Sequence, residues 1–75
     1  MQHYLFSVAN NKVTDFDGEV PGTSPNFHLW ETSFGVEKIY YHTKEGKVVE
    51  VICEAFDQVS ARKAVTQFLE SLDNM

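Results

Sequence analysis

The chain has 75 residues, of which 43% are hydrophobic and 13% aromatic, a composition typical of a globular protein and not of a disordered segment. Its 11 acidic residues outnumber its 6 basic ones, and the net charge of −5 argues against ordinary nucleic-acid binding, because phosphates would be repelled. With a single cysteine, no signal peptide and no apolar run near about 18 residues, we expect one cytoplasmic domain over 1–75 without a disulfide or a membrane anchor.

Two short strands are expected first. Residues 4–9 are rich in β-forming side chains. Asn10 and Asn11 tolerate the left-handed backbone of a tight turn, so residues 13–16 are expected to return beside the first strand. Residues 17–25 contain four glycine or proline residues and are predicted to form a loop.

Acidic side chains dominate the stretch between Lys12 and Lys38, which contains no other lysine or arginine. They are either solvated charges on loops and strands or an acidic interaction surface. The spacing of the first few resembles part of a calcium-binding loop but lacks its bidentate glutamate, so no calcium site is predicted. The candidate acidic surface consists of Asp15, Asp17, Glu19, Glu31 and Glu37.

Residues 26–34 allow two interpretations. Pro25 before them and Gly35 after them would frame a short helix. Alternatively the segment is a strand, and the loops 33–35 and 44–46 are both three-residue turns that end in a glycine bulge. We favour the strand because one turn rule then explains two loops and gives one continuous apolar face.

The register of the hairpin around residues 44–46 follows from its apolar side chains. A two-residue turn would pair Thr43 with Val48 and mix charged with apolar side chains on one face. A three-residue turn pairs Thr43 with Lys47 and keeps one face apolar, so it is the turn we predict. The pairs expected from it are Ile39 with Val51, Tyr41 with Val49 and, in the preceding strand, Leu29 with Ile39 and Phe27 with Tyr41.

The C-terminal segment predicts an amphipathic helix. Asp57 is a suitable N-cap, and Phe56 before it is expected to pack on Ala61. Apolar residues then recur at helical spacing on one face as far as Leu72. The expected fold class is therefore α+β: an antiparallel β-meander of three to five strands with this helix packed on one face.

The predicted register leaves an aromatic surface on the other face of the sheet. Such a surface is too apolar to face only water, so either another part of the chain, a second copy or a protein partner covers it. Trp30 and Tyr40 would be the anchors for a partner, since buried aromatics are frequent hot spots. The candidate partner-binding residues are His28, Trp30, Lys38, Tyr40 and His42, and Val48, Glu50 and Ile52 are expected on the same face.

No histidine or cysteine spacing typical of zinc sites and no catalytic motif is found, so no catalytic residue, metal or cofactor is predicted. We expect an interaction or regulatory protein without catalytic activity, which acts through the aromatic face or a sheet edge as a homodimer. One alternative is an acidic, phage-type regulator that mimics nucleic acid and inhibits a DNA- or RNA-handling protein. The other is a ligand- or metal-binding subunit that uses His28, Trp30 and His42.

Overall fold

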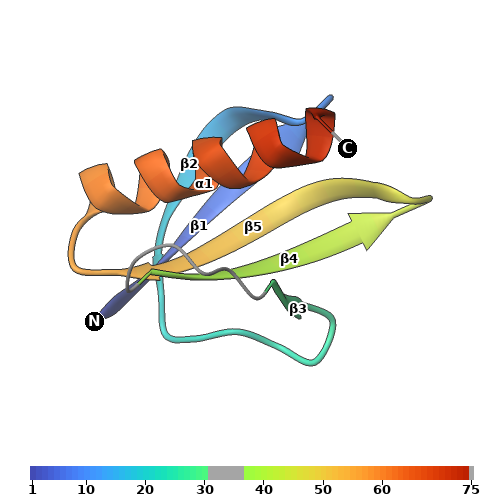
Figure 1. The fold of residues 1–75 in the computed structure, drawn as a ribbon. Helices are drawn as coiled ribbons and strands as arrows, with labels where there is room; N and C mark the ends of the chain where they lie inside the picture. Colours follow the sequence, from blue (N-terminus) through green and yellow to red (C-terminus); the bar gives the residue numbers. More distant parts are fainter. Residues whose placement is uncertain (31–36, 75) are drawn as a thin grey trace.

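The computed structural model describes residues 1–30 and 37–74. It contains a five-stranded antiparallel sheet of strand order β2-β1-β5-β4-β3, with one helix, α1, packed on one face (Figure 1). The α+β class predicted from the sequence is confirmed, and the favoured strand in the ambiguous segment is confirmed for His28–Trp30. The elements are β1 (Gln2–Ala9), β2 (Lys12–Val20), β3 (His28–Trp30), β4 (Lys38–Lys44), β5 (Lys47–Ala55) and α1 (Gln58–Asp73).

The hairpin of β1 and β2 begins as expected, because Asn10 and Asn11 have φ values of 54° and 60°. β2 is longer than predicted and continues to Val20. Two register shifts between β1 and β2 mark bulges, and Gly18 adopts a φ of 106°. An edge strand tolerates such irregularity, so the glycine does not end the strand.

The turn between β4 and β5 differs from the prediction. Thr43 pairs with Val48, and Glu45 and Gly46 form a two-residue turn in which both φ values are positive. The predicted three-residue turn is therefore wrong. A bulge at Val49 follows the turn and restores the alternation of apolar and polar side chains along β5. The bulge, which the prediction did not include, thus keeps one face of the hairpin apolar.

As a consequence, both predicted pairings across this hairpin are shifted. Ile39 lies opposite Cys53, and Tyr41 lies opposite Val51. Val48, which was expected on the outer face, is buried in the core at 8% exposure. The bulge accounts for this difference, because it inserts one residue between Val48 and the rest of β5.

The core lies between α1 and the sheet. Asp57 caps α1 as predicted, its Oδ1 accepting a hydrogen bond of 2.7 Å from the Ser60 N–H. Phe56, which was expected to pack on Ala61, is 71% exposed. No helix within the described residues is long and apolar enough to cross a membrane. The buried core cluster comprises Phe6, Val8, Ile39, Val48, Val51, Cys53, Ala55, Ala61, Val65, Phe68 and Leu69.

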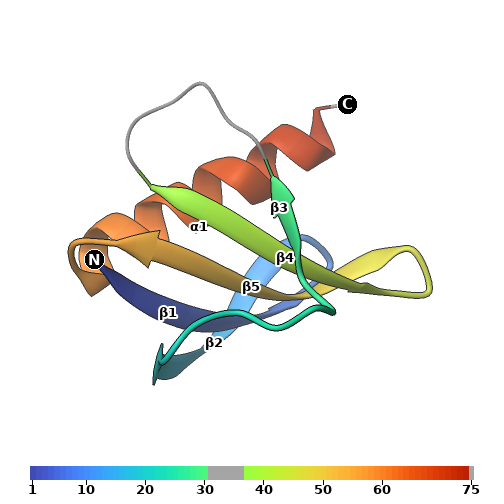
Figure 2. The same cartoon turned by 90° about the horizontal axis from the view of Figure 1, so that it is seen from below.

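The face of the sheet away from α1 is crossed by the segment 21–27, which joins β2 to β3 (Figures 1 and 2). His42 fastens this segment, since its Nδ1 lies 3.1 Å from the Asn26 carbonyl oxygen and its ring contacts the Phe27 ring. Ile52, at the centre of this face, is 4% exposed. Part of the chain itself therefore covers the centre of this face, which is one of the coverings that the sequence allowed.

Candidate functional site

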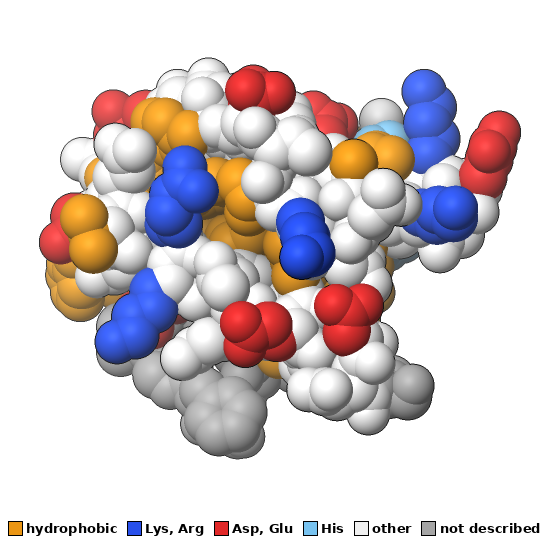
Figure 3. Space-filling model, turned by 90° about the horizontal axis from the view of Figure 1, so that it is seen from above, with side chains coloured by type: hydrophobic (Ala, Val, Ile, Leu, Met, Phe, Trp, Pro, Cys, Tyr) orange, Lys and Arg blue, Asp and Glu red, His pale blue; other side chains and the backbone are white. Residues whose placement is uncertain are grey.

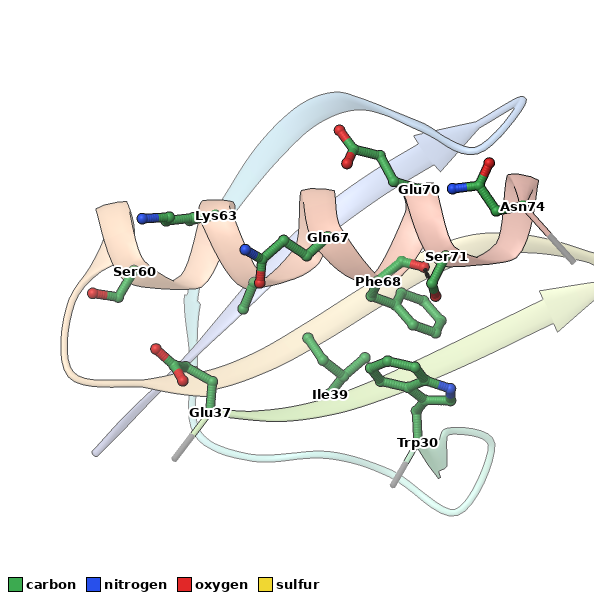
Figure 4. A pocket seen from close by; sticks show the side chains of 11 residues that line it. Trp30, Glu37, Ile39, Ser60, Lys63, Gln67, Phe68, Glu70, Ser71 and Asn74 are labelled. Atoms are coloured by element: carbon green, nitrogen blue, oxygen red, sulfur yellow. Dashed lines mark hydrogen bonds between the residues drawn. The ribbon is translucent and has the colours of Figure 1, made fainter. Parts of the chain in front are cut away.

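A concave site lies beside α1. The helix packs mainly on β5, the central strand, so the helix-side surface of β4 and β3 extends beyond it. A hollow of about 660 Å³ lies there, which we call the helix cleft (Figure 4). Its lining residues are Trp30, Glu37 and Ile39 from the strand side and Ser60, Lys63, Ala64, Gln67, Phe68, Glu70, Ser71 and Asn74 from α1.

Trp30 reaches the helix cleft because of the register of β3. It pairs with Ile39, while Leu29 pairs with Tyr40, so the predicted Leu29–Ile39 pairing is wrong by one residue. The shift turns the indole of Trp30 towards α1 instead of the opposite face. There its ring lies 4.9 Å from the Phe68 ring, at an interplanar angle of 58°.

Trp30 ends a line of aromatic contacts. The Phe68 ring lies 5.6 Å from that of Tyr41, which in turn lies 5.8 Å from the His28 ring. Tilted ring pairs of this kind stabilise a fold by about 0.5–1.5 kcal/mol each beyond their buried area. Phe68 is 1% exposed, whereas Trp30 is only partly buried. The indole of Trp30 thus packs on the buried Phe68 ring with part of its own surface, and the rest of the indole stays exposed.

A second hollow, of about 350 Å³, adjoins the helix cleft on the other side of the same ring pair. Trp30 and Phe68 line both hollows, and Tyr41 and Leu72 contribute to the second one. Trp30 therefore contributes surface to two neighbouring concave regions.

The partner-binding residues predicted from the sequence lie on two faces. His28 and Trp30 lie on the helix side. Lys38, Tyr40 and His42 lie on the face that the segment 21–27 crosses. The expectation that these five residues share one surface is therefore wrong. They are separated because β3 pairs with β4 one residue away from the predicted register.

The same division separates the residues of the ligand- or metal-binding alternative. His28 and Trp30 are on the opposite side of the sheet from His42. In the part of the chain that the structure describes, no three side chains of histidine, cysteine, aspartate or glutamate lie close enough to hold a metal ion.

The predicted acidic residues do not form one surface. Asp15, Asp17 and Glu19 lie on β2 at one edge of the sheet, and Asp17 accepts a hydrogen bond from the Ser7 hydroxyl. Glu37 lines the helix cleft beside the opposite edge, and Glu31 lies outside the described residues. On the helix side, acidic and basic side chains are interspersed, with hydrophobic ones visible between them (Figure 3).

Cys53 lies in the core and is fully buried. Burial, together with the smaller effect of the charges of Glu37 and Glu54, raises the pKa of its thiol from 9.0 to about 12. Because Cys53 is buried, a substrate cannot reach its sulfur. Because its pKa is raised, the side chain stays a thiol at neutral pH and does not form the thiolate, which is the nucleophilic form of cysteine.

Most of the helix wall of the cleft was missed by the sequence argument. Gln67 and Ser71 are polar and were not among the predicted site residues. Their spacing from Ser60 and Ala64 is that of one helical stripe, directly beside the apolar one, and this regularity is the signal that could have identified them.

Comparisons with protein-family models, with curated proteins and with solved structures found no match to this chain. Any function must therefore be argued from the residues of the site themselves.

Proposed function

We propose that this chain is a small interaction protein without catalytic activity, which binds a protein partner in the helix cleft. The observation that carries the proposal is the position of Trp30, held against the buried Phe68 ring at 4.9 Å while part of the indole stays exposed between two hollows. Tryptophan is enriched among the residues that dominate binding energy, particularly in pockets that lose water on association.

The lining of the helix cleft suits a protein partner. Its floor is apolar, with Trp30, Ile39 and Phe68, and its rim is polar and carries charges of both signs, including Lys63 and Glu70. An apolar centre with a polar rim is the common arrangement of protein interfaces. The volume of about 660 Å³ leaves room for several side chains of a partner.

Two other modes of binding a partner receive less support. Strand addition at β2 is disfavoured because bulges and the carboxylates of Asp15, Asp17 and Glu19 are devices that discourage pairing at a sheet edge. Mimicry of nucleic acid is disfavoured because Glu37 lies beside the opposite edge of the sheet from these three carboxylates on β2.

Trp30 is the only tryptophan of the chain, so its fluorescence reports directly on this site. The test compares partners captured from the native host by the wild type, by Trp30→Ala and by Tyr40→Glu, a control on the opposite face. We expect a partner to be retained by the wild type and the control, to lose at least about tenfold in affinity for Trp30→Ala, and to shift the Trp30 emission to the blue. A partner lost only with Tyr40→Glu would instead place binding on the opposite face. Circular dichroism should first show that all three chains are folded.

A further inference from the structure

β3 is a short strand, and the side of the sheet on which Trp30 lies depends on its register. The strand has three residues. A slip of one residue exchanges the two faces of a strand, so it would move Trp30 from the helix side to the opposite face of the sheet. The described pairs of β3 with β4 are His28 with Tyr41, Leu29 with Tyr40 and Trp30 with Ile39.

The apolar pattern of this segment does not by itself select the observed register. Trp30 lies on the helix side, whereas Leu29 lies on the other face and is 50% exposed. After a slip of one residue, Leu29 would lie opposite Ile39, on the helix side. Phe27 would then lie opposite Tyr41, which also faces α1. Since either register brings apolar side chains to the helix side, another interaction has to choose between them.

A turn directly before β3 sets the position of the strand. Residues 24–27 form this turn, in which the Phe27 N–H donates a hydrogen bond of 3.0 Å to the Ser24 carbonyl oxygen. Pro25 and Asn26 occupy its two central positions, where proline supplies the required φ and asparagine is frequent. Because β3 begins at the next residue, the place of this turn along β4 determines which residues of the two strands are paired.

His42 of β4 holds the turn in place by two contacts. Continuing the observed pairs by one residue puts Phe27 opposite His42, and their rings lie 5.6 Å apart. The His42 Nδ1 also lies 3.1 Å from the Asn26 carbonyl oxygen. A carbonyl oxygen only accepts, so this nitrogen carries the hydrogen and donates it. In the slipped register Phe27 would face the other side of the sheet, and its contact with His42 would be lost.

We propose that His42 is a positioning residue for Trp30. By holding Asn26 and Phe27 it fixes the register of β3, and this register places the indole on the helix side, against Phe68. A side chain on one face of the sheet thus decides what the opposite face presents. Because His42 acts in this way in the free protein, the proposal goes beyond the proposed function and holds whether or not the helix cleft binds a partner.

The test compares variants of His42 in the isolated protein by nuclear magnetic resonance and fluorescence. His42→Ala should stay folded by circular dichroism, but it should lose the nuclear Overhauser contact between the Trp30 and Phe68 rings and shift the Trp30 emission to the red. A new contact between Leu29 and Ile39 would identify the slipped register. His42→Asn should keep the wild-type contacts, because its side-chain amide can donate to the same carbonyl oxygen.

His3→Ala is the matched control. His3 lies on the same face of the sheet as His42, on β1, and its described contacts are with Tyr40 and Glu54. This variant loses an imidazole from the same face without touching the turn, so the contact between Trp30 and Phe68 should be unchanged.

A second substitution distinguishes a slipped strand from a loosened one. Leu29→Glu should be tolerated in the observed register, where Leu29 is half exposed, but in the slipped register it would place a carboxylate against the buried Ile39. Added to His42→Ala, it should therefore restore the contact between Trp30 and Phe68. A failure to restore it, or an unchanged contact in His42→Ala, would overturn the proposal. Loss of the contact in His42→Asn or His3→Ala, or an unfolded His42→Ala chain, would also overturn it.

Discussion

Cys53 is a titratable group in the interior of the protein. It lies in the central strand, between Tyr4 of β1 and Ile39 of β4, and is fully buried. Burial is the main reason why the pKa of its thiol rises to about 12. The folded protein therefore holds this proton more tightly than the unfolded chain does, and the stability depends on pH in a defined direction.

We expect the free energy of unfolding to fall as the pH rises above 9.0 towards about 12. The folded-state pKa exceeds the unfolded value, so the contribution of Cys53 is complete below 9.0 and is lost as the pH passes through about 12. Urea unfolding midpoints on both sides of pH 9.0 should show this loss, and Cys53→Ala should give a flatter dependence. Some slope will remain, because burial also raises the pKa of Tyr4. An equal slope in the variant would show that Cys53 does not control it.

Among the elements, α1 depends on one local hydrogen bond at its start. The Ser60 N–H donates to Asp57, and this bond lowers the pKa of the Asp57 carboxyl. Because the folded pKa is the lower one, the contribution of the cap is present above 3.8 and is lost as the pH falls through the folded-state value.

Asp57→Ala should lower the midpoint of thermal unfolding by about 4–8 °C, through loss of the cap. Gln58→Ala, one position later in the exposed first turn, is the control and should change the midpoint little. Melting followed by circular dichroism measures both. If the two variants melt alike, the cap contributes nothing specific and the helix start is stabilised in another way.

Sequence reasoning predicted the elements whose signals are local. The asparagine turn after β1, the Asp57 cap and the apolar stripe of α1 each depend on neighbouring residues only. The turn at Glu45 and Gly46 was misassigned because strict alternation was assumed, whereas the bulge at Val49 interrupts it. A bulge has no clear sequence signal, since it adds a residue without changing the composition of the strand.

The candidate site was less predictable, for a different physical reason. The helix cleft exists because one helix covers only part of a sheet with five strands, and this follows from strand order and not from any local pattern. Trp30 was among the residues singled out from the sequence, but the face on which it lies depends on the pairing of β3 with β4. A shift of one residue was enough to turn it to the other side.

At the scale of the whole molecule, the core has little stability to spare. A chain of 75 residues has a free energy of unfolding on the order of 4–11 kcal/mol. Val51 and Phe68 are 0% and 1% exposed, on the two sides of the interface between sheet and helix. An unpaired charge at either position costs several kcal/mol, which is comparable with the total.

Val51→Asp and Phe68→Asp should therefore each abolish cooperative thermal unfolding. Val59→Asp is the matched control, because Val59 is 79% exposed and the same change there leaves the core intact. Circular dichroism and tryptophan fluorescence should show a folded control and two unfolded variants. A cooperative transition in either core variant would contradict the assignment of the core.

Self-association through the face away from α1 stays a prediction. It was predicted because the sequence left an aromatic surface uncovered. In the structure, however, the segment 21–27 crosses that face, and Ile52 is only 4% exposed. Leu29, beside Tyr40, is 50% exposed and is the apolar group left for a contact between copies. The solution mass of the wild type, compared with that of Leu29→Lys, decides whether such a contact forms.

The pairing of β1 with β5 has a consequence for how the protein is made. These two strands form the middle of the sheet, yet Gln2 pairs with Ala55, so the first strand waits for most of the chain to be synthesised. On the ribosome, the hairpin of β1 and β2 emerges long before its partner and has no core to join. Isolated hairpins are at best marginally stable in water. The fold can therefore form only once β5 and α1 have left the exit tunnel, and until then the apolar side of β1 is available to chaperones.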